Sequence, residues 1–299
     1  MLKITRDTVV YAMSPDNAPV ARVKDGDTLI FETMDCFSGQ LAKESDQLGP
    51  LDWGRINPAT GPVYIEGAAP GDTLKVEILR IDLAPQAATV ESPDSGITGL
   101  AAKEEHTKIL PVSEGKVVFN DCITLPEQAM IGVIGTAPAA GAISTGTPDL
   151  HGGNMDCKCI GAGTTLYLPV NVEGALLAMG DLHALMGDGE VEVCGVEIAG
   201  AVTVRVTALK QCALPTPFLV NDDTFMSIFS ALTVDEACVG ATMSMHGFLM
   251  KELGLNEHEA GMLLSVVGNL RICQIVDPEK TCRMELPKSI AETYGYEFA

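Results

Sequence analysis

Basic residues are scarce in this sequence, where 19 lysines and arginines stand against 40 aspartates and glutamates and give a net charge of −21. Such a chain repels nucleic acid phosphates and anionic lipid at long range, so we expect neither as a partner. Solubility alone is sufficient reason for this charge, but it also leaves neutral or cationic small molecules open as substrates. Uninterrupted apolar runs are short as well, and none approaches the roughly eighteen residues of a membrane span.

Several familiar site signatures are also missing. No G-x-G-x-x-G follows an expected strand, and no Walker A or G-x-S-x-G sequence occurs, which argues against nucleotide binding and covalent serine hydrolysis. Nine cysteines, an odd number lying mostly in apolar stretches, predict reduced and packed thiols rather than disulfides. Cys157 and Cys159 are spaced C-x-C without a second pair, which does not fit a structural zinc site.

The N-terminal segment carries charge where a secretory signal would have its apolar core, so we expect a cytoplasmic protein. Short alternating segments separated by glycine and proline predict a mainly β fold. Residues 27–34 and 72–81 both follow a Gly-Asp turn, whereas residues 49–72 and 83–115 are expected to be loops. Further strands are expected at 129–135, 164–172, 175–185 and 190–209.

The C-terminal third changes to a helical pattern. Thr233 followed by Glu236 is typical of a capping box, which predicts a helix over 234–253, and Asn256 is expected to cap a second helix. The chain is therefore predicted to be α+β, mainly β, with a β-sandwich or barrel-like body and C-terminal helices. Two subdomains are expected, a β-rich one at 1–150 and one at 151–299 in which strands precede helices.

The predicted helices also carry more apolar surface than packing on one sheet requires. This excess favours a homodimer or a higher homo-oligomer. The apolar side chains concerned are Met243, Met245, Phe248, Leu249 and Met250.

Ionisable residues gather in two glycine-framed clusters, HGGNMDCKC from residue 151 and GDLHALMGDGE from residue 180. Residues two apart in a strand share a face, so Asp181 and His183 are expected to project together, as are Asn154 and Asp156. Carboxylate and imidazole ligands fit a divalent ion, with zinc favoured and calcium as an alternative. Such a site favours metal-assisted attack by water.

The residues around the two clusters allow further roles. The glycines leave backbone amides near Gly152 accessible to a developing oxyanion. Asp35 ends an apolar strand and either faces the same pocket or closes a turn. Lys158 either polarises a carbonyl group or pairs with Asp156.

At these residues the sequence resembles the acetamidase/formamidase family. The matching stretches are residues 57–78, HGGNMD at 151–156 and residues 168–191, followed by EIAGAVTVRV. The resemblance implies a β-rich, oligomeric hydrolase of small linear amides that releases ammonia and a carboxylic acid. It implies metal or catalytic roles at His151, Asn154, Asp156, Asp181, His183 and Glu190.

These observations define one predicted site. We expect Glu190 to act as the general acid and base, because it lies beyond two glycines and has a longer side chain than the aspartates. The other catalytic candidates are Asn154 and Lys158, and the metal candidates are His183, Asp181, Asp156, Asp35 and His151. The alternative is a non-catalytic binding module in which the same residues hold a structural calcium.

Overall fold

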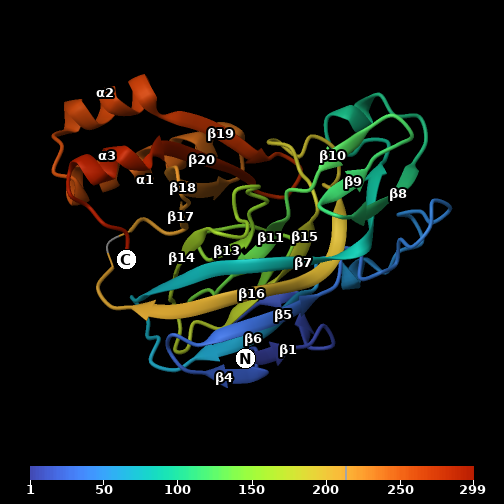
Figure 1. The fold of residues 1–299 in the computed structure, drawn as a ribbon, viewed down its shortest axis with the longest axis horizontal. Helices are drawn as coiled ribbons and strands as arrows, with labels where there is room; N and C mark the ends of the chain where they lie inside the picture. Colours follow the sequence, from blue (N-terminus) through green and yellow to red (C-terminus); the bar gives the residue numbers. More distant parts are fainter. Residues whose placement is uncertain (213) are drawn as a thin grey trace.

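The computed structural model describes residues 1–212 and 214–299, and strands dominate this part of the chain (Figure 1). The strands before residue 150 are β1 (Leu2–Ile4), β2 (Val9–Val10), β3 (Ala12–Met13), β4 (Ala21–Val23), β5 (Thr28–Thr33), β6 (Ala59–Ile65), β7 (Thr73–Glu91), β8 (His106–Ser113), β9 (Lys116–Val118), β10 (Thr124–Pro126), β11 (Met130–Gly135) and β12 (Ile143–Ser144). The later strands are β13 (Gly152–Asn154), β14 (Thr165–Pro169), β15 (Leu177–His183), β16 (Glu197–Leu209), β17 (Phe218–Val220), β18 (Thr224–Ala231), β19 (Asn269–Gln274) and β20 (Lys280–Pro287).

Helices cover one end of the molecule. The α-helices are α1 (Val234–Glu252), α2 (Glu257–Val267) and α3 (Lys288–Thr293), and short 3-10 helices occur at Trp53–Arg55 and Thr98–Leu100. No helix in the described residues combines the length and the apolar character needed to cross a membrane. The α+β, mainly β class expected from the sequence is confirmed.

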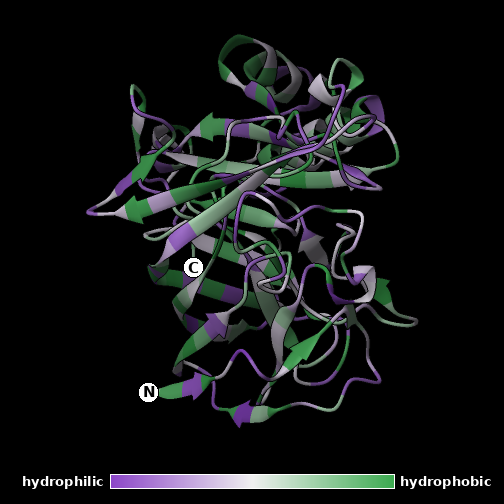
Figure 2. Ribbon diagram, turned by 90° about the vertical axis from the view of Figure 1, so that its right-hand side faces the viewer, coloured by the Kyte–Doolittle hydropathy of each residue, from purple (hydrophilic) through white to green (hydrophobic). Residues whose placement is uncertain are grey.

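The long antiparallel pair of β7 and β16 runs across the body of the molecule (Figure 1). On its flanks β16 pairs with β5, and β7 pairs with β8 and β14. Buried and more exposed residues alternate along much of β5, β7 and β16, because one face packs on the main core, and many strands in Figure 2 carry alternating hydrophobic and hydrophilic bands. Strand β7 precedes residue 150 and its partner β16 follows it. The division into two subdomains at residue 150 stays a prediction.

Strands β11 and β15 pair antiparallel inside this body, and every residue of both is buried. Strand β15 also pairs with β6 and β16, and β11 also pairs with β13. A strand surrounded in this way normally reads as a continuous apolar run. The ionisable residues of β15 are therefore almost fully buried and must be accommodated within the protein.

The C-terminal helices pack on the sheet formed by β17 to β20, where a second apolar core lies. Helix α1 begins at the predicted capping box, in which Glu236 N donates to Thr233 Oγ1 and Thr233 N donates to Glu236. Asn256 caps α2 as expected. Of the apolar residues expected on the helix surface, Met245, Phe248 and Leu249 are buried in this second core instead.

The structure corrects three local predictions. Residues 49–72 contain β6, although their glycines and prolines predicted a loop. The strand packs closely on β15 because Gly61 has no side chain, whereas a Cβ there would lie 2.8 Å from Leu177 O. Residues 83–115 contain the second half of β7 and all of β8, although their hydrophobic periodicity is weak. The two strands pair with each other, and this pairing stabilises them. The C-terminal third contains strands β17 to β20 besides its helices.

Candidate active site

His183, at the end of β15, is the centre of a buried acidic cluster. It is the register partner of Glu197, the first residue of β16, and its Nε2 lies 3.0 Å from Glu197 Oε1. Both side chains are 1% exposed. Three further carboxylates lie near the same nitrogen, namely Asp181 Oδ1 at 3.5 Å, Asp156 Oδ1 at 3.8 Å and Glu190 Oε1 at 4.0 Å.

Backbone strain accompanies this convergence. Asp156, Asp181 and Glu190 have φ values of 41°, 54° and 41°, in a region that residues with a Cβ seldom adopt. Such conformations cost on the order of 1–3 kcal/mol each and persist where the surrounding structure imposes them. Asp181 therefore reaches His183 from an irregular backbone, although the sequence argument assumed regular alternation along a strand.

Space for the carboxylates comes from a glycine on the neighbouring strand. A Cβ at Gly132 of β11 would lie 2.6 Å from Asp181 Oδ2 and still closer to Asp156 Oδ1. Any side chain at this position would displace the two carboxylates. Gly132 is therefore part of the site, and nothing in the local sequence distinguished it from other strand glycines.

Electrostatics oppose full ionisation of the cluster. Burial raises the pKa of Asp156 and of Glu190, and each effect is reinforced by a neighbouring carboxylate. Burial also raises the pKa of Glu197 to about 7. For His183 burial lowers the pKa, but Glu197 and Asp181 outweigh it, so that the pKa is raised.

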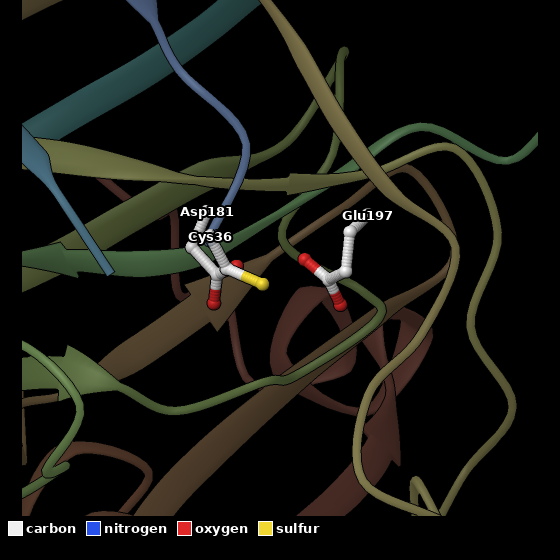
Figure 3. Close-up of side chains that lie close together, drawn as sticks. All are labelled: Cys36, Asp181 and Glu197. Carbon is white, nitrogen blue, oxygen red and sulfur yellow. The ribbon is translucent and has the colours of Figure 1, made fainter. Parts of the chain in front are cut away.

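The cluster offers ligand atoms for a cation in two adjacent groups. One consists of Asp156, His183 and Glu190, and the other consists of Cys36, Asp181 and Glu197 (Figure 3). Within each group the ligand atoms lie within 4.8 Å of one another. Glu197 and Cys36 were not predicted from the sequence. The register between β15 and β16 brings Glu197 to His183, and this register cannot be read from the sequence.

Unsatisfied oxygens test whether these residues fit a metal. Four carboxylate oxygens in the cluster are buried and accept no hydrogen bond from any residue that the structure describes. They are Asp156 Oδ1, Asp181 Oδ1, Glu190 Oε2 and Glu197 Oε2. Buried acceptors without donors are costly, and a divalent cation satisfies them while lowering their pKa values again. Carboxylate, imidazole and thiol donors together suit zinc.

Asn154, on β13, and Asp277, between β19 and β20, extend the site. Asn154 Nδ2 donates to Asp277 Oδ2 at 2.9 Å, and burial raises the pKa of Asp277. Both residues line a cavity of about 570 Å³ whose floor is formed by the acidic cluster. Asp277 lies far along the chain from both predicted motifs, and no sequence signal pointed to it.

Besides Asn154, three predicted site residues lie outside the two ligand groups. The Asp35 carboxylate accepts a hydrogen bond from Gly39 N and closes a turn, so that its neighbour Cys36 faces the cluster instead. Lys158 pairs with Asp188 at 3.0 Å rather than with Asp156. His151 is buried, and burial lowers its pKa to about 4, so the imidazole is neutral near pH 7.

A mainly β chain whose acidic and histidine side chains converge at the floor of a cavity has the architecture of an enzyme. A model of the acetamidase/formamidase family matches residues 5–141 and 91–293. The chain therefore belongs to the acetamidase/formamidase family.

Individual relatives agree with this assignment. A formamidase of Methylophilus methylotrophus is 28% identical over 298 residues, which cover 75% of this chain and 72% of that protein. An acetamidase of Mycolicibacterium smegmatis is 26% identical, over 66% of this chain and 64% of that protein. The chain thus spans slightly less than two thirds of the Mycolicibacterium protein.

Solved structures resemble the chain over nearly its whole length. The crystal structure of an acetamidase from Bacillus halodurans is 48% identical and superimposes with a TM-score of 0.97, covering 98% of this chain and 99% of that one. A predicted acetamidase/formamidase from Thermoanaerobacter tengcongensis is 44% identical with a TM-score of 0.97, covering 99% of both chains.

Proposed function

We propose that this protein hydrolyses the carbon–nitrogen bond of small linear amides and uses a divalent cation to do so. The observation that carries the proposal is the group of unsatisfied carboxylate oxygens around His183 on the cavity floor. The family and the relatives named formamidase and acetamidase support the substrate class. The products are ammonia and a carboxylate.

The residues that would hold the cation are Asp156, Asp181 and His183, together with Glu197, whose Oε1 lies at the same Nε2 atom of the imidazole. Zinc is favoured over calcium, because the site includes imidazole nitrogen and has the Cys36 thiol within its second ligand group. When bound, such a cation polarises the amide carbonyl and lowers the pKa of water. Exclusion from bulk solvent strengthens every electrostatic interaction in the cluster.

Glu190 is assigned the proton transfers. Its Oε2 is buried and accepts no hydrogen bond from the described residues, so it is available to a substrate or a water molecule. Burial and the Asp156 carboxylate raise the pKa of Glu190, as a group that both accepts and returns a proton requires. Glu190 takes a proton from the attacking water and delivers it to the departing nitrogen, because an unprotonated amide anion is a poor leaving group.

Asn154 is assigned to the carbonyl oxygen. One hydrogen of its side-chain amide is held by Asp277, and the second is left to donate into the cavity. The backbone amide of Gly152 does not serve this purpose, since it donates to Asp149 O at 3.0 Å. A positioned donor of this kind stabilises the negative charge that develops on oxygen during attack.

Ammonia release from formamide and acetamide tests this function. The purified protein is expected to release ammonia and the matching carboxylate in equal amounts, and an Asp181→Asn His183→Ala double variant is expected to release none. A folded protein that binds a metal tightly yet hydrolyses neither amide would instead act as a metal-stabilised binding module.

We also propose that the chain self-associates through its C-terminal helices. Val239 and Met243 of α1 and Met262 and Val266 of α2 are exposed apolar side chains, which a second copy would cover. Light scattering at micromolar concentration is expected to give at least twice the 31.5 kDa chain mass, and a mass of one chain contradicts this proposal. The cytoplasmic location stays a prediction.

A further inference from the structure

The cavity beside the acidic cluster has two chemically different sets of lining residues. One consists of the carboxylates and His183, and the other consists of large apolar side chains. These are Phe37, Leu48, Trp53, Ile56 and Val193. Trp53 belongs to the 3-10 helix Trp53–Arg55, and its side chain remains 59% exposed at the cavity mouth.

The cavity is far larger than the smallest amides. Its volume is about 570 Å³, within the range of pockets that hold drug-sized ligands. Acetamide has four non-hydrogen atoms and takes the space of roughly two or three water molecules, each about 30 Å³ in the liquid. Formamide or acetamide on the cavity floor would leave the space beside the apolar side chains to water.

Charge restricts what else fills this space. Asp94 and Asp277 line the cavity beside the four carboxylates of the cluster, and none of its lining residues in the described chain is a lysine or an arginine. A second carboxylate on the substrate, away from the proposed cation, would be repelled and would find no lysine or arginine among the lining residues. An uncharged apolar group meets no such penalty and gains from burial against the apolar side chains.

We infer that the preferred substrates are neutral primary amides whose acyl part carries an apolar group of about the size of a phenyl ring. This inference rests on the proposed amidase function and specifies its substrate class. The amide lies on the cavity floor near Glu190 and Asn154, and the apolar group packs against Phe37 and Trp53. Water adds to the carbonyl carbon, the carbon–nitrogen bond breaks, and the nitrogen leaves as ammonia after it has received a proton, leaving an arylalkanoate.

A substrate series tests this inference through ammonia release from formamide, acetamide and phenylacetamide. The kcat/KM for phenylacetamide is expected to exceed that for acetamide by roughly tenfold or more, the usual scale for filling a hydrophobic pocket. Phenylacetamide carrying a para carboxylate, which has similar shape but one negative charge, is expected to lose at least that factor. Equal or higher kcat/KM for acetamide, or for the carboxylated amide, overturns the inference.

Substitution of Trp53 tests the location of the apolar group. Trp53→Ala is expected to lower the phenylacetamide-to-acetamide ratio of kcat/KM by about tenfold, and Trp53→Phe to retain most of it. Because the ratio compares two substrates on one enzyme, a partly unfolded preparation does not distort it. Tyr294→Ala removes another half-exposed aromatic ring outside the cavity and is the matched control. An unchanged ratio in Trp53→Ala contradicts the proposed position.

Trp53 is the only tryptophan in the sequence, so its fluorescence reports occupancy of the cavity mouth without turnover. Titration of the Glu190→Gln variant with phenylacetamide is expected to change the emission saturably, whereas acetamide at the same concentrations leaves it unchanged. The outcomes separate the two proposals. Ammonia from acetamide with no reaction and no fluorescence change for phenylacetamide overturns this inference alone, whereas no ammonia from any amide overturns the amidase function as well.

Discussion

His183 and Glu197 face each other across β15 and β16, with Nε2 and Oε1 3.0 Å apart and both side chains almost fully buried. Nε2 is also the imidazole atom nearest the Asp181, Asp156 and Glu190 carboxylates, so Glu197 and His183 would bind the same cation. Glu197→Gln keeps the shape of the side chain but removes its charge. We expect a 10- to 100-fold loss in metal affinity or in kcat/KM, measured by metal titration and ammonia release.

Glu173→Gln is the matched control for this variant, because Glu173 is exposed and the substitution makes the same chemical change at the surface. It is expected to behave like the unmodified protein. Metal affinity and kcat/KM that both stay within a factor of two in Glu197→Gln would show that the contact with His183 is dispensable.

Glu190 and His183 are expected to fail in different ways when replaced. Glu190→Gln should retain the fold and the metal while kcat falls by about 10² or more, the usual scale for a lost general acid and base. His183→Ala should lose metal as well as activity. Metal content, circular dichroism and kcat measured on the same preparations separate the two effects, and near-normal turnover in a metal-loaded Glu190→Gln protein rules out the assigned role.

Gly132 is expected to be essential despite having no side chain. In Gly132→Ala the added methyl group would displace the Asp156 and Asp181 carboxylates, and misplacement by about 1 Å can cost on the order of 10² in rate. Gly49→Ala is the control, because a Cβ there meets nothing within 4 Å and its φ is not positive. If both variants have normal kcat/KM, the close approach at Gly132 has no functional weight.

His151 makes stability depend on pH. Burial lowers its pKa from 6.5 to about 4, so between these values the unfolded chain binds a proton that the folded protein does not. The free energy of unfolding therefore has its full value with respect to His151 above pH 6.5. It falls by about 3 kcal/mol in all as the pH drops toward 4. Urea unfolding at pH 4.5 and 7 should show a smaller difference in His151→Gln than in the unmodified protein.

The exposed His258→Gln serves as the control for His151 and should leave the pH difference unchanged. The unmodified protein and the two variants share the same buried carboxyl groups. Comparing their differences in unfolding free energy between pH 4.5 and pH 7 therefore cancels the contributions of those groups. An identical pH difference in His151→Gln would mean that the buried imidazole is not the group responsible.

Local signals in the sequence were sufficient where a few adjacent residues determine the structure. The capping box of Thr233 and Glu236 identified the start of α1, and alternation identified β5. Residues 49–72 were predicted wrongly as a loop, because Gly61 there permits a close approach between β6 and β15, which depends on a distant strand.

The candidate site was recovered in part for the same reason. Asp156, Asp181, His183 and Glu190 lie in short motifs and do converge in space. Glu197, Cys36 and Asp277 come from other strands and loops, and only the tertiary fold brings them to His183. The left-handed backbone at the three acids is likewise imposed by surrounding structure, so residue types alone do not reveal it.

Metal content measured together with amidase activity tests the central claim most directly. Elemental analysis of the purified protein should find a divalent metal, zinc in preference to calcium, in at least an equimolar amount. A strong chelator should remove both the metal and ammonia release from acetamide, and zinc added back should restore them, because we propose that Asp156, Asp181 and His183 hold the cation used in hydrolysis. Undiminished ammonia release from protein shown to contain no metal would contradict the account.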